Sequence, residues 1–376
     1  MAATPSGSIV VPSRPGRLAA WLRKEWGLLL ALALFILFPF AFGLLTGTNA
    51  TTGANRFWQG LLIQFFIMAV YAMSYDLLMG YVGILTFGQA AFFGGGGYAI
   101  SLFLKFMAPS VKANYLISFP GLGDITDFVL LLVGFLLVIA VSILLGLLFS
   151  ALSARVKGVY FAMITLAAAE AIHLLSKASD FVQWTGADDG LVGVPLPGWL
   201  NPTQNRLFFY FLCLAFLVVM YLVLQRIVNS PTGRIFQAIR ENENRVQAVG
   251  YDPAVYRSLA FVISGVAAGL AGAFFSLWNQ SANPSMTDSL STINALIMTI
   301  LGGVGTLIGP IIGAGILQLI GQFFASWFGP RWPLVFGIVF IALVLFLPYG
   351  IVGTWRSRKF SWKEGRKKLL SLLKVG

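Results

Sequence analysis

Long apolar runs separated by short polar segments dominate this chain. The clearest runs cover residues 27–45, 57–79, 84–104, 128–153, 156–177, 207–228, 258–279 and 332–349, and a longer run at 290–328 is interrupted by GGVGTLIGP. A helix needs about 20 apolar residues to cross the hydrocarbon core of a bilayer, so each run predicts a membrane-spanning helix. We therefore expect an all-α fold, a polytopic transmembrane helical bundle of about ten spans.

Composition supports a membrane protein. Hydrophobic residues make up 58% of the 376 residues, and charged residues only 10%. The first apolar run is too long for the apolar part of a signal peptide, so we interpret it as a true first span. The single cysteine, Cys213, lies within an apolar run, which excludes a disulfide framework and a cysteine metal cluster.

The net charge of +12 comes from bases that cluster between spans. They lie in an N-terminal segment (1–26), at Arg155 and Lys157, in a polar insert (229–256) and in a C-terminal tail (355–376). Such segments face the cytoplasm, and this distribution favours a membrane topology over nucleic-acid binding. With both termini inside, the number of spans is even, which favours ten. The spans and the insert then form one transmembrane domain, 27–354.

Acidic residues concentrate in the loops predicted to lie on the opposite side of the membrane. These residues are Asp124, Asp127, Asp180, Asp188, Asp189 and Asp288.

Two glycine-rich segments resemble each other. GYVGILTFGQAAFFGGGGYA begins at Gly80 and GGVGTLIGPIIGAGILQLIG begins at Gly302; each follows an apolar run and contains V-G-x-L. They predict an internal repeat, inverted or direct, with Gly-interrupted helices. Paired segments of this kind indicate a translocation pathway, although plain packing of small residues is the alternative. The pathway candidates are Asp76, Gly80, Gly83, Gly88, Gln89, Gly302, Gly303 and Gly305.

Ionisable residues inside the apolar runs are few. Asp76 either bonds the unwound GYVG backbone or acts directly in the pathway, because a buried carboxylate is costly. Glu170 and His173 stand three residues apart, but a di-metal bundle needs this E-x-x-H pair twice and it occurs once. We therefore expect no metal site.

The segment GRIFQAIRENENRVQAVGYDPAVY, residues 233–256, interrupts the apolar pattern. Ser230 and Thr232 are helix-capping residues on either side of Pro231, and Gly250 ends the helical pattern. The insert predicts a pair of amphipathic cytoplasmic helices that docks into a groove on a soluble partner, with a helix lying on the lipid surface as the alternative. Its apolar side chains are Ile235, Ile239, Val246 and Val249, and its charged ones are Arg240, Glu241, Glu243 and Arg245.

Four motifs together resemble one family. The Gly80 segment, TGADDGLVGVP from Thr185, the insert with the following span, and MTILGGVGTLIGPIIGA occur in the order found in LivM-type permeases of ATP-binding cassette importers for branched-chain amino acids, over about residues 57–350. The resemblance implies a permease in a prokaryotic cell membrane that pairs with a related second permease, two cytoplasmic ATPase subunits and an external solute-binding protein. It implies no cofactor in this chain, since the partner subunits bind ATP.

The resemblance also assigns residues to roles. Residues 233–250 match the family's coupling helix, and the implied coupling residues are Gly233, Arg234, Ile239, Arg240, Glu241, Glu243, Val246 and Gly250. Residues expected to face the solute-binding protein are Trp184, Asp188, Asp189 and Asn283. Asp76 and Gln89 stand where many relatives have Asn and His, and related permeases import urea, short amides or carboxylates. The resemblance therefore supports transport more firmly than it supports an amino acid as the substrate.

Other functions fit the sequence poorly. A secondary transporter normally carries several intramembrane acids or histidines, and a membrane enzyme needs a catalytic constellation such as HExxH or GxSxG. The sequence has no GxxxxGK[ST] motif, so energy from ATP has to come from a partner. The basic tail, rich in Trp and Leu, is expected to lie along the cytoplasmic lipid leaflet.

Overall fold

A computed structural model describes residues 26–46, 53–113, 123–156, 158–346 and 350–357. The chain divides into two compact units, residues 1–56 and 57–376. The first unit contains the apolar helix α2 (Trp26–Thr46), which includes Pro39. The Asn55 side chain donates a 2.8 Å hydrogen bond to the Pro39 carbonyl.

The described part of the second unit is mainly helical, and α3 (Ala54–Asp76) leads into it. In chain order its elements are the π-helix η1 (Leu77–Val82), α4 (Gln89–Leu102), η2 (Phe103–Met107), α5 (Ala108–Ala113), α6 (Gly123–Arg155), α7 (Val159–Lys177), η3 (Ser179–Phe181), α8 (Val182–Thr185), η4 (Ala187–Asp189), β1 (Leu191–Val192), α9 (Arg206–Val228), α10 (Pro231–Glu241), α11 (Glu243–Ala248), α12 (Pro253–Asn279), β2 (Ser281–Ala282), η5 (Pro284–Met286), α13 (Ser289–Gly302), α14 (Ile308–Phe328), η6 (Gly329–Arg331), α15 (Trp332–Phe346) and α16 (Gly350–Ser357).

The predicted polytopic all-α fold is confirmed. Within the described residues, seven helices are long and apolar enough to cross a membrane, and two shorter apolar helices cover Leu30–Leu44 and Ser289–Gly302. The long run at 290–328 is divided where the sequence predicts it, between α13 and α14. The count of ten spans and the boundaries at 27 and 354 stay predictions.

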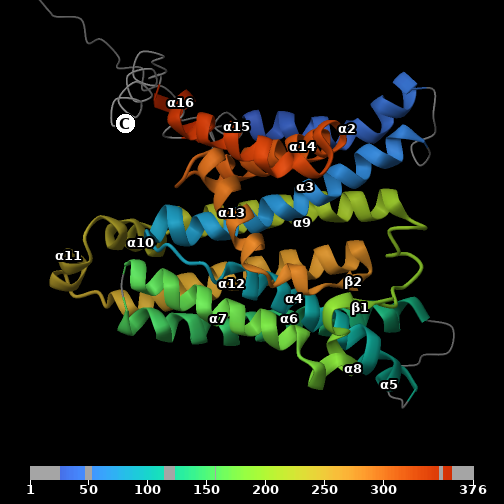
Figure 1. Cartoon of the computed structure of the whole chain (residues 1–376), viewed down its shortest axis with the longest axis horizontal. Helices are drawn as coiled ribbons and strands as arrows, with labels where there is room; N and C mark the ends of the chain where they lie inside the picture. Colours follow the sequence, from blue (N-terminus) through green and yellow to red (C-terminus); the bar gives the residue numbers. More distant parts are fainter. Residues whose placement is uncertain (1–25, 47–52, 114–122, 157, 347–349, 358–376) are drawn as a thin grey trace, which may run out of the picture. The chain divides into compact units, whose positions relative to one another are not determined.

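Helices α3, α6, α7, α9 and α12 run side by side, with α10 and α11 at one end of them and the antiparallel pair β1 and β2 at the other (Figure 1). Arg257 at the start of α12 donates a 3.3 Å hydrogen bond to the Ser153 carbonyl, so the turn after α6 lies at the α10 end. Lys177 and Asp188 form a 3.0 Å ion pair at the opposite end. The turn with Arg155 and the polar insert (229–256) therefore lie at the same end of the helices, in agreement with the prediction that both face the same side of the membrane.

The core is formed where α4 packs between α6 and α12. A Cβ atom on Gly96 would lie 2.5 Å from Gly269 Cα, so the backbones of α4 and α12 approach as closely as small residues permit. Gln89 Nε2 donates to Ser74 Oγ at 2.8 Å and to Ser264 Oγ at 3.0 Å. This buried amide fastens α4 to both α3 and α12.

The helix break after α3 is stabilised by side chains from other helices. Gly83 has a φ of +80° and ends η1, with its N–H bonded to the Leu78 carbonyl, and residues 84–88 form no helix before α4 begins. Thr165 Oγ1 accepts from Phe87 N at 3.1 Å, and Thr292 Oγ1 donates to Phe87 O at 3.1 Å. Irregular backbone is tolerated at membrane depth only when its polar groups are satisfied in this way or by water in a cavity.

Candidate functional site

The polar insert forms the helix pair α10 and α11. Ser230 Oγ accepts a 3.3 Å hydrogen bond from Gly233 N, so Ser230 alone caps α10; the prediction that Thr232 is also a cap is wrong, because Thr232 lies inside the helix. Asn242 Oδ1 caps α11 by accepting from Arg245 N at 3.1 Å. Gly250, with a φ of +95°, follows α11 and ends the pair as predicted.

Two of the four predicted apolar contact residues are covered by the chain itself. Ile239 is only 8% exposed and Val246 only 6% exposed, whereas Val249 is 75% exposed. Little of either Ile239 or Val246 is therefore left to contact a partner, and the expectation that they do so stays a prediction. The sequence shows that one face of each helix is apolar, but it does not show that these two side chains are buried within the chain.

The outward face of the insert contains a hollow of about 510 Å³. Its lining combines apolar side chains with both signs of charge, and consists of Arg234, Ile235, Ala238, Glu241, Asn242, Arg245, Val246, Val249 and Tyr251. This surface lies on solvent-exposed helices at the basic end of the chain. Its mixed lining suits contact with a folded partner better than contact with lipid tails alone.

The two glycine segments meet beside α10. Asp76, with no exposed surface, accepts a 2.7 Å hydrogen bond on Oδ1 from Gly305 N. Arg240 on α10 donates from Nη1 to the carbonyl of Gly80. A Cβ atom on Gly305 would lie 3.2 Å from Arg240 Nη1 and 3.3 Å from Gly80 O. We call Asp76, Gly80, Arg240 and Gly305 the glycine junction.

The glycine junction bears on the interpretation that Asp76 bonds unwound backbone. Its carboxylate bonds unwound backbone, as one interpretation requires, but the bonded backbone belongs to the second glycine segment at Gly305 and not to GYVG. Gly83 contacts the same helix, because a Cβ there would lie 2.7 Å from Arg240 Cγ. A direct role of these residues in a pathway stays a prediction.

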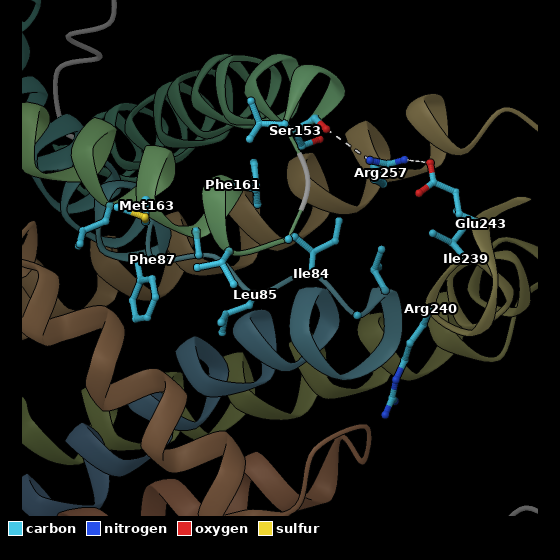
Figure 2. Close-up of a pocket in the computed structure, with 17 residues that line it drawn as sticks. Ile84, Leu85, Phe87, Ser153, Phe161, Met163, Ile239, Arg240, Glu243 and Arg257 are labelled. Atoms are coloured by element: carbon cyan, nitrogen blue, oxygen red, sulfur yellow. Dashed lines mark hydrogen bonds and ion pairs between the residues drawn. The ribbon is translucent and has the colours of Figure 1, made fainter.

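A second contact between the insert and the other helices lies on the opposite side of a crevice of about 510 Å³ from the glycine junction. Arg257 forms an ion pair with Glu243 of α11 and bonds the Ser153 carbonyl of α6. Figure 2 shows Arg257 between these two partners, while Arg240 extends away from them. The crevice is lined mainly by apolar side chains of residues 82–87 and of α7, among them Leu85 and Met163.

The other glycine candidates pack against neighbouring backbone and aromatic groups. A Cβ on Gly88 would lie 2.8 Å from Phe149 Cδ1, and one on Gly302 would lie 2.9 Å from Pro310 N. Gly303 is contacted by Gly350, whose added Cβ would lie 2.5 Å from Gly303 Cα. These contacts show close packing at each position.

The residues predicted to face a solute-binding protein lie together at the end opposite α10. Trp184 is 54% exposed and packs on Phe106 at a ring distance of 5.3 Å. Asp188 and Asp189 lie in η4, both exposed, and Asn283 is exposed at the start of η5. The pairing of β1 with β2 brings these two loops side by side.

His173 joins α7 to the same end. Its Nδ1 lies 3.1 Å from the Pro284 carbonyl and 3.0 Å from Thr287 Oγ1, so the ring fastens α7 to the segment before α13. Glu170 is half-buried one turn earlier.

Sequence reasoning missed the residues that connect the insert to the membrane helices. Arg257 follows directly after the predicted insert, and its signal is a cation within the apolar helix α12, about one turn after the Asp252 cap. Thr165 and Thr292 gave no signal, because hydroxyl residues are common in apolar helices and their partners are distant in sequence.

The comparisons agree with this arrangement. Residues 57–347 match the family described as branched-chain amino acid transport system, permease component. The chain is 25% identical to the high-affinity branched-chain amino acid transport system permease protein LivM of Escherichia coli strain K12, over 80% of this chain and 71% of that protein. It is 26% identical to the probable LivM permease of Methanocaldococcus jannaschii, over 78% and 92% of the two chains.

A shorter match covers part of another permease. The chain is 32% identical to the probable branched-chain amino acid transport permease protein LivH of Methanocaldococcus jannaschii, over 43% of this chain and 50% of that protein. No solved structure is significantly similar. Because the family match covers most of the described helices, the chain belongs to the family of permease components of branched-chain amino acid transport systems.

Proposed function

We propose that this chain is a permease subunit of an ATP-binding cassette importer and forms half of a membrane pathway for branched-chain or related amino acids. The observation that carries the proposal is family membership over residues 57–347, together with two LivM relatives matched over more than three quarters of this chain. A solute-binding protein would deliver the amino acid at the end formed by Trp184, Asp188, Asp189 and Asn283. The site of action would be a prokaryotic cell membrane.

The other half of the pathway would be a related permease. The partial match to a LivH permease supports a partner with a similar fold, because LivM and LivH relatives occur in the same organism. The substrate would be recognised first by the solute-binding protein. Amino acid uptake is therefore tested with the native binding protein and its bound solute, and urea or short amides serve as competing solutes.

Energy would come from two ATPase subunits that bind the insert. The hollow on α10 and α11 supports this, since it exposes Val249 and Tyr251, with the half-buried Ile235, between charged side chains. Burying an aliphatic side chain such as Val249 contributes roughly 1.5–3 kcal/mol, which corresponds to about 10- to 100-fold in affinity. Arg234, Glu241 and Arg245 at the hollow would mainly fix orientation. No cofactor is required in this chain.

The docking surface is tested with a matched pair of variants. Val249→Glu places a charge in the hollow, and Val192→Glu places the same change on a valine that is 62% exposed at the opposite end. Each variant is purified from membranes with the ATPase subunit from the same transport system, and the copurifying ATPase is quantified. We expect at least tenfold less ATPase with Val249→Glu and an unchanged amount with Val192→Glu.

Equal ATPase recovery with both valine variants would contradict docking at this hollow. Recovery of no ATPase with the unsubstituted chain, while the ATPase binds the related permease, would contradict the importer proposal for this chain.

A further inference from the structure

Arg240 is the point where the cytoplasmic helix pair touches the interrupted helices. It lies one residue from the end of α10, and its guanidinium reaches the carbonyl of Gly80 in η1. The last carbonyls of a helix lack partners within the helix, and π-helical segments are frequent at functional positions. The same guanidinium lies beside the Gly305 backbone, so one side chain of α10 contacts both glycine segments.

Asp76 joins the same two segments from inside the membrane domain. Its position at the end of α3 places it one helical turn before Gly80, and its Oδ1 holds Gly305 N at 2.7 Å. Its Oδ2 accepts no hydrogen bond from the described residues, and the nearby Arg240 provides the opposite charge. A carboxylate kept in such a costly position indicates a function that an apolar residue would not fulfil.

The residues of the glycine junction are closely packed. A Cβ on Gly80 would lie 2.5 Å from Gly305 N and 2.8 Å from Asp76 Cγ, and a Cβ on Gly83 would meet Arg240 at 2.7 Å. Packed elements of this kind move as units, because close-packed interfaces do not deform continuously. A displacement of α10 therefore moves η1 and the loop 303–307 together.

The helix pair is also tied to the opposite wall of the crevice. Glu243 of α11 pairs with Arg257, which bonds Ser153 at the end of α6 (Figure 2). The crevice of about 510 Å³ separates this attachment from residues 82–87, which follow the junction. The pair α10 and α11 thus contacts both walls of the crevice.

We propose that Arg240 and Asp76 are positioning residues that transmit movement of α10 to both glycine-interrupted segments, while the link through Glu243 and Arg257 holds the other wall of the crevice in place. This inference rests on the proposed function, in which ATPase subunits move α10. Transmission requires the hydrogen bonds at Gly80 and Gly305, so it depends on the acceptor at Asp76 and the donor at Arg240.

The test uses the complete importer reconstituted in vesicles, with solute uptake and ATP hydrolysis measured in the same sample. Arg240→Met and Asp76→Leu remove the donor and the acceptor. Asp76→Asn keeps an Oδ1 acceptor, and Arg226→Met removes an exposed cytoplasmic arginine at the end of α9 as a control. The readout is the amount of solute imported per ATP hydrolysed, with ATPase copurification as the measure of assembly.

We expect Arg240→Met and Asp76→Leu to keep bound, hydrolysing ATPase subunits but to lower the ratio of solute to ATP by roughly tenfold, within the range of coupling between two sites. Asp76→Asn and Arg226→Met are expected to keep the ratio within about twofold. Asp76→Asn keeps the acceptor for Gly305 N, and Arg226 is not part of the glycine junction. Loss of the ratio in Asp76→Asn equal to that in Asp76→Leu would show that the charge matters and would overturn the inference.

A second readout follows the structure directly. Leu85 lines the crevice and is 40% exposed, whereas the native Cys213 is buried, so Leu85→Cys provides one accessible thiol. We expect a nonhydrolysable ATP analogue to change the rate of maleimide labelling at residue 85, and Arg240→Met to abolish that change. The same nucleotide response with and without Arg240 would overturn the inference and leave the proposed function intact. An unsubstituted importer without ATP-driven uptake would overturn both.

Discussion

The ion pair between Arg257 and Glu243 offers a quantitative test of how the insert is held. Arg257 lies in α12, its side chain is 10% exposed, and it pairs with Glu243 of α11, whose side chain is 22% exposed. Arg257 also donates to the Ser153 carbonyl at 3.3 Å. We predict that Arg257→Met releases α11 from the membrane helices without unfolding the rest of the chain.

The magnitude follows from burial. Removing one partner of a fully buried ion pair costs about 3–5 kcal/mol, and a hydrogen bond to a charged group contributes about 1.5–3 kcal/mol. Glu243 retains contact with water, so we expect the smaller cost, that of losing a hydrogen bond to a charged group, which is about 2 kcal/mol for opening of α11. That free energy corresponds to about 30-fold in the local opening equilibrium.

Hydrogen exchange of the α11 amides measures this opening in vesicles. A double-mutant cycle with Arg257→Met and Glu243→Gln separates the pair from other contacts of each side chain. We expect each single variant to lower protection of α11 by roughly 10- to 30-fold and the double variant to lower it little further. Glu241→Gln, on the exposed face of α10, serves as the control.

Additive effects of the two substitutions would refute the reasoning, because they would mean that the side chains stabilise α11 independently. Unchanged protection of α11 in Arg257→Met would refute the reasoning more directly. It would mean that the contacts of Arg257 with Glu243 and with the Ser153 carbonyl are not needed to hold α11.

Three further predictions concern other parts of the chain. Leu at Gly88 or Gly305 is expected to abolish uptake, because a side chain at Gly88 would collide with Phe149 and Gly305 has a φ of +78° that strains any other residue, and unchanged uptake by a correctly inserted variant would contradict a role of these segments in the pathway. Replacing Asp188 and Asp189 by Lys is expected to lower ATP hydrolysis stimulated by the binding protein while basal hydrolysis persists; equal loss of both would count against a receptor surface there. The tail prediction covers residues 355–376, of which 355–357 belong to α16 and 358–376 lie outside the described residues; it is tested by labelling Lys367, which should react only from the cytoplasmic side.

Much of the fold could be predicted because membrane spans are encoded locally. An apolar run of sufficient length has to form a helix in lipid, so α3, α6, α7, α9 and α12 correspond to runs visible in the sequence. The breaks at the glycine segments and the helical insert were also visible, since glycine, proline and capping residues act on their immediate neighbours.

The contacts between segments could not be predicted in this way. Asp76 and Gly305 are separated by 229 positions, and Arg240 and Gly80 by 160, so no local pattern relates them. The burial of Ile239 was missed for the same reason: an amphipathic helix reveals which face is apolar but not whether its own chain or a partner covers that face.

ATP-driven uptake tests the central claim most directly. The chain is reconstituted in vesicles with its partner permease and ATPase subunits, ATP is enclosed on the ATPase side, and labelled leucine is supplied outside with the solute-binding protein. We predict accumulation of leucine that requires both ATP and the binding protein and is unaffected by dissipating ion gradients. Accumulation by this chain alone in an ion gradient, without ATP or partners, would contradict the account and identify a secondary transporter.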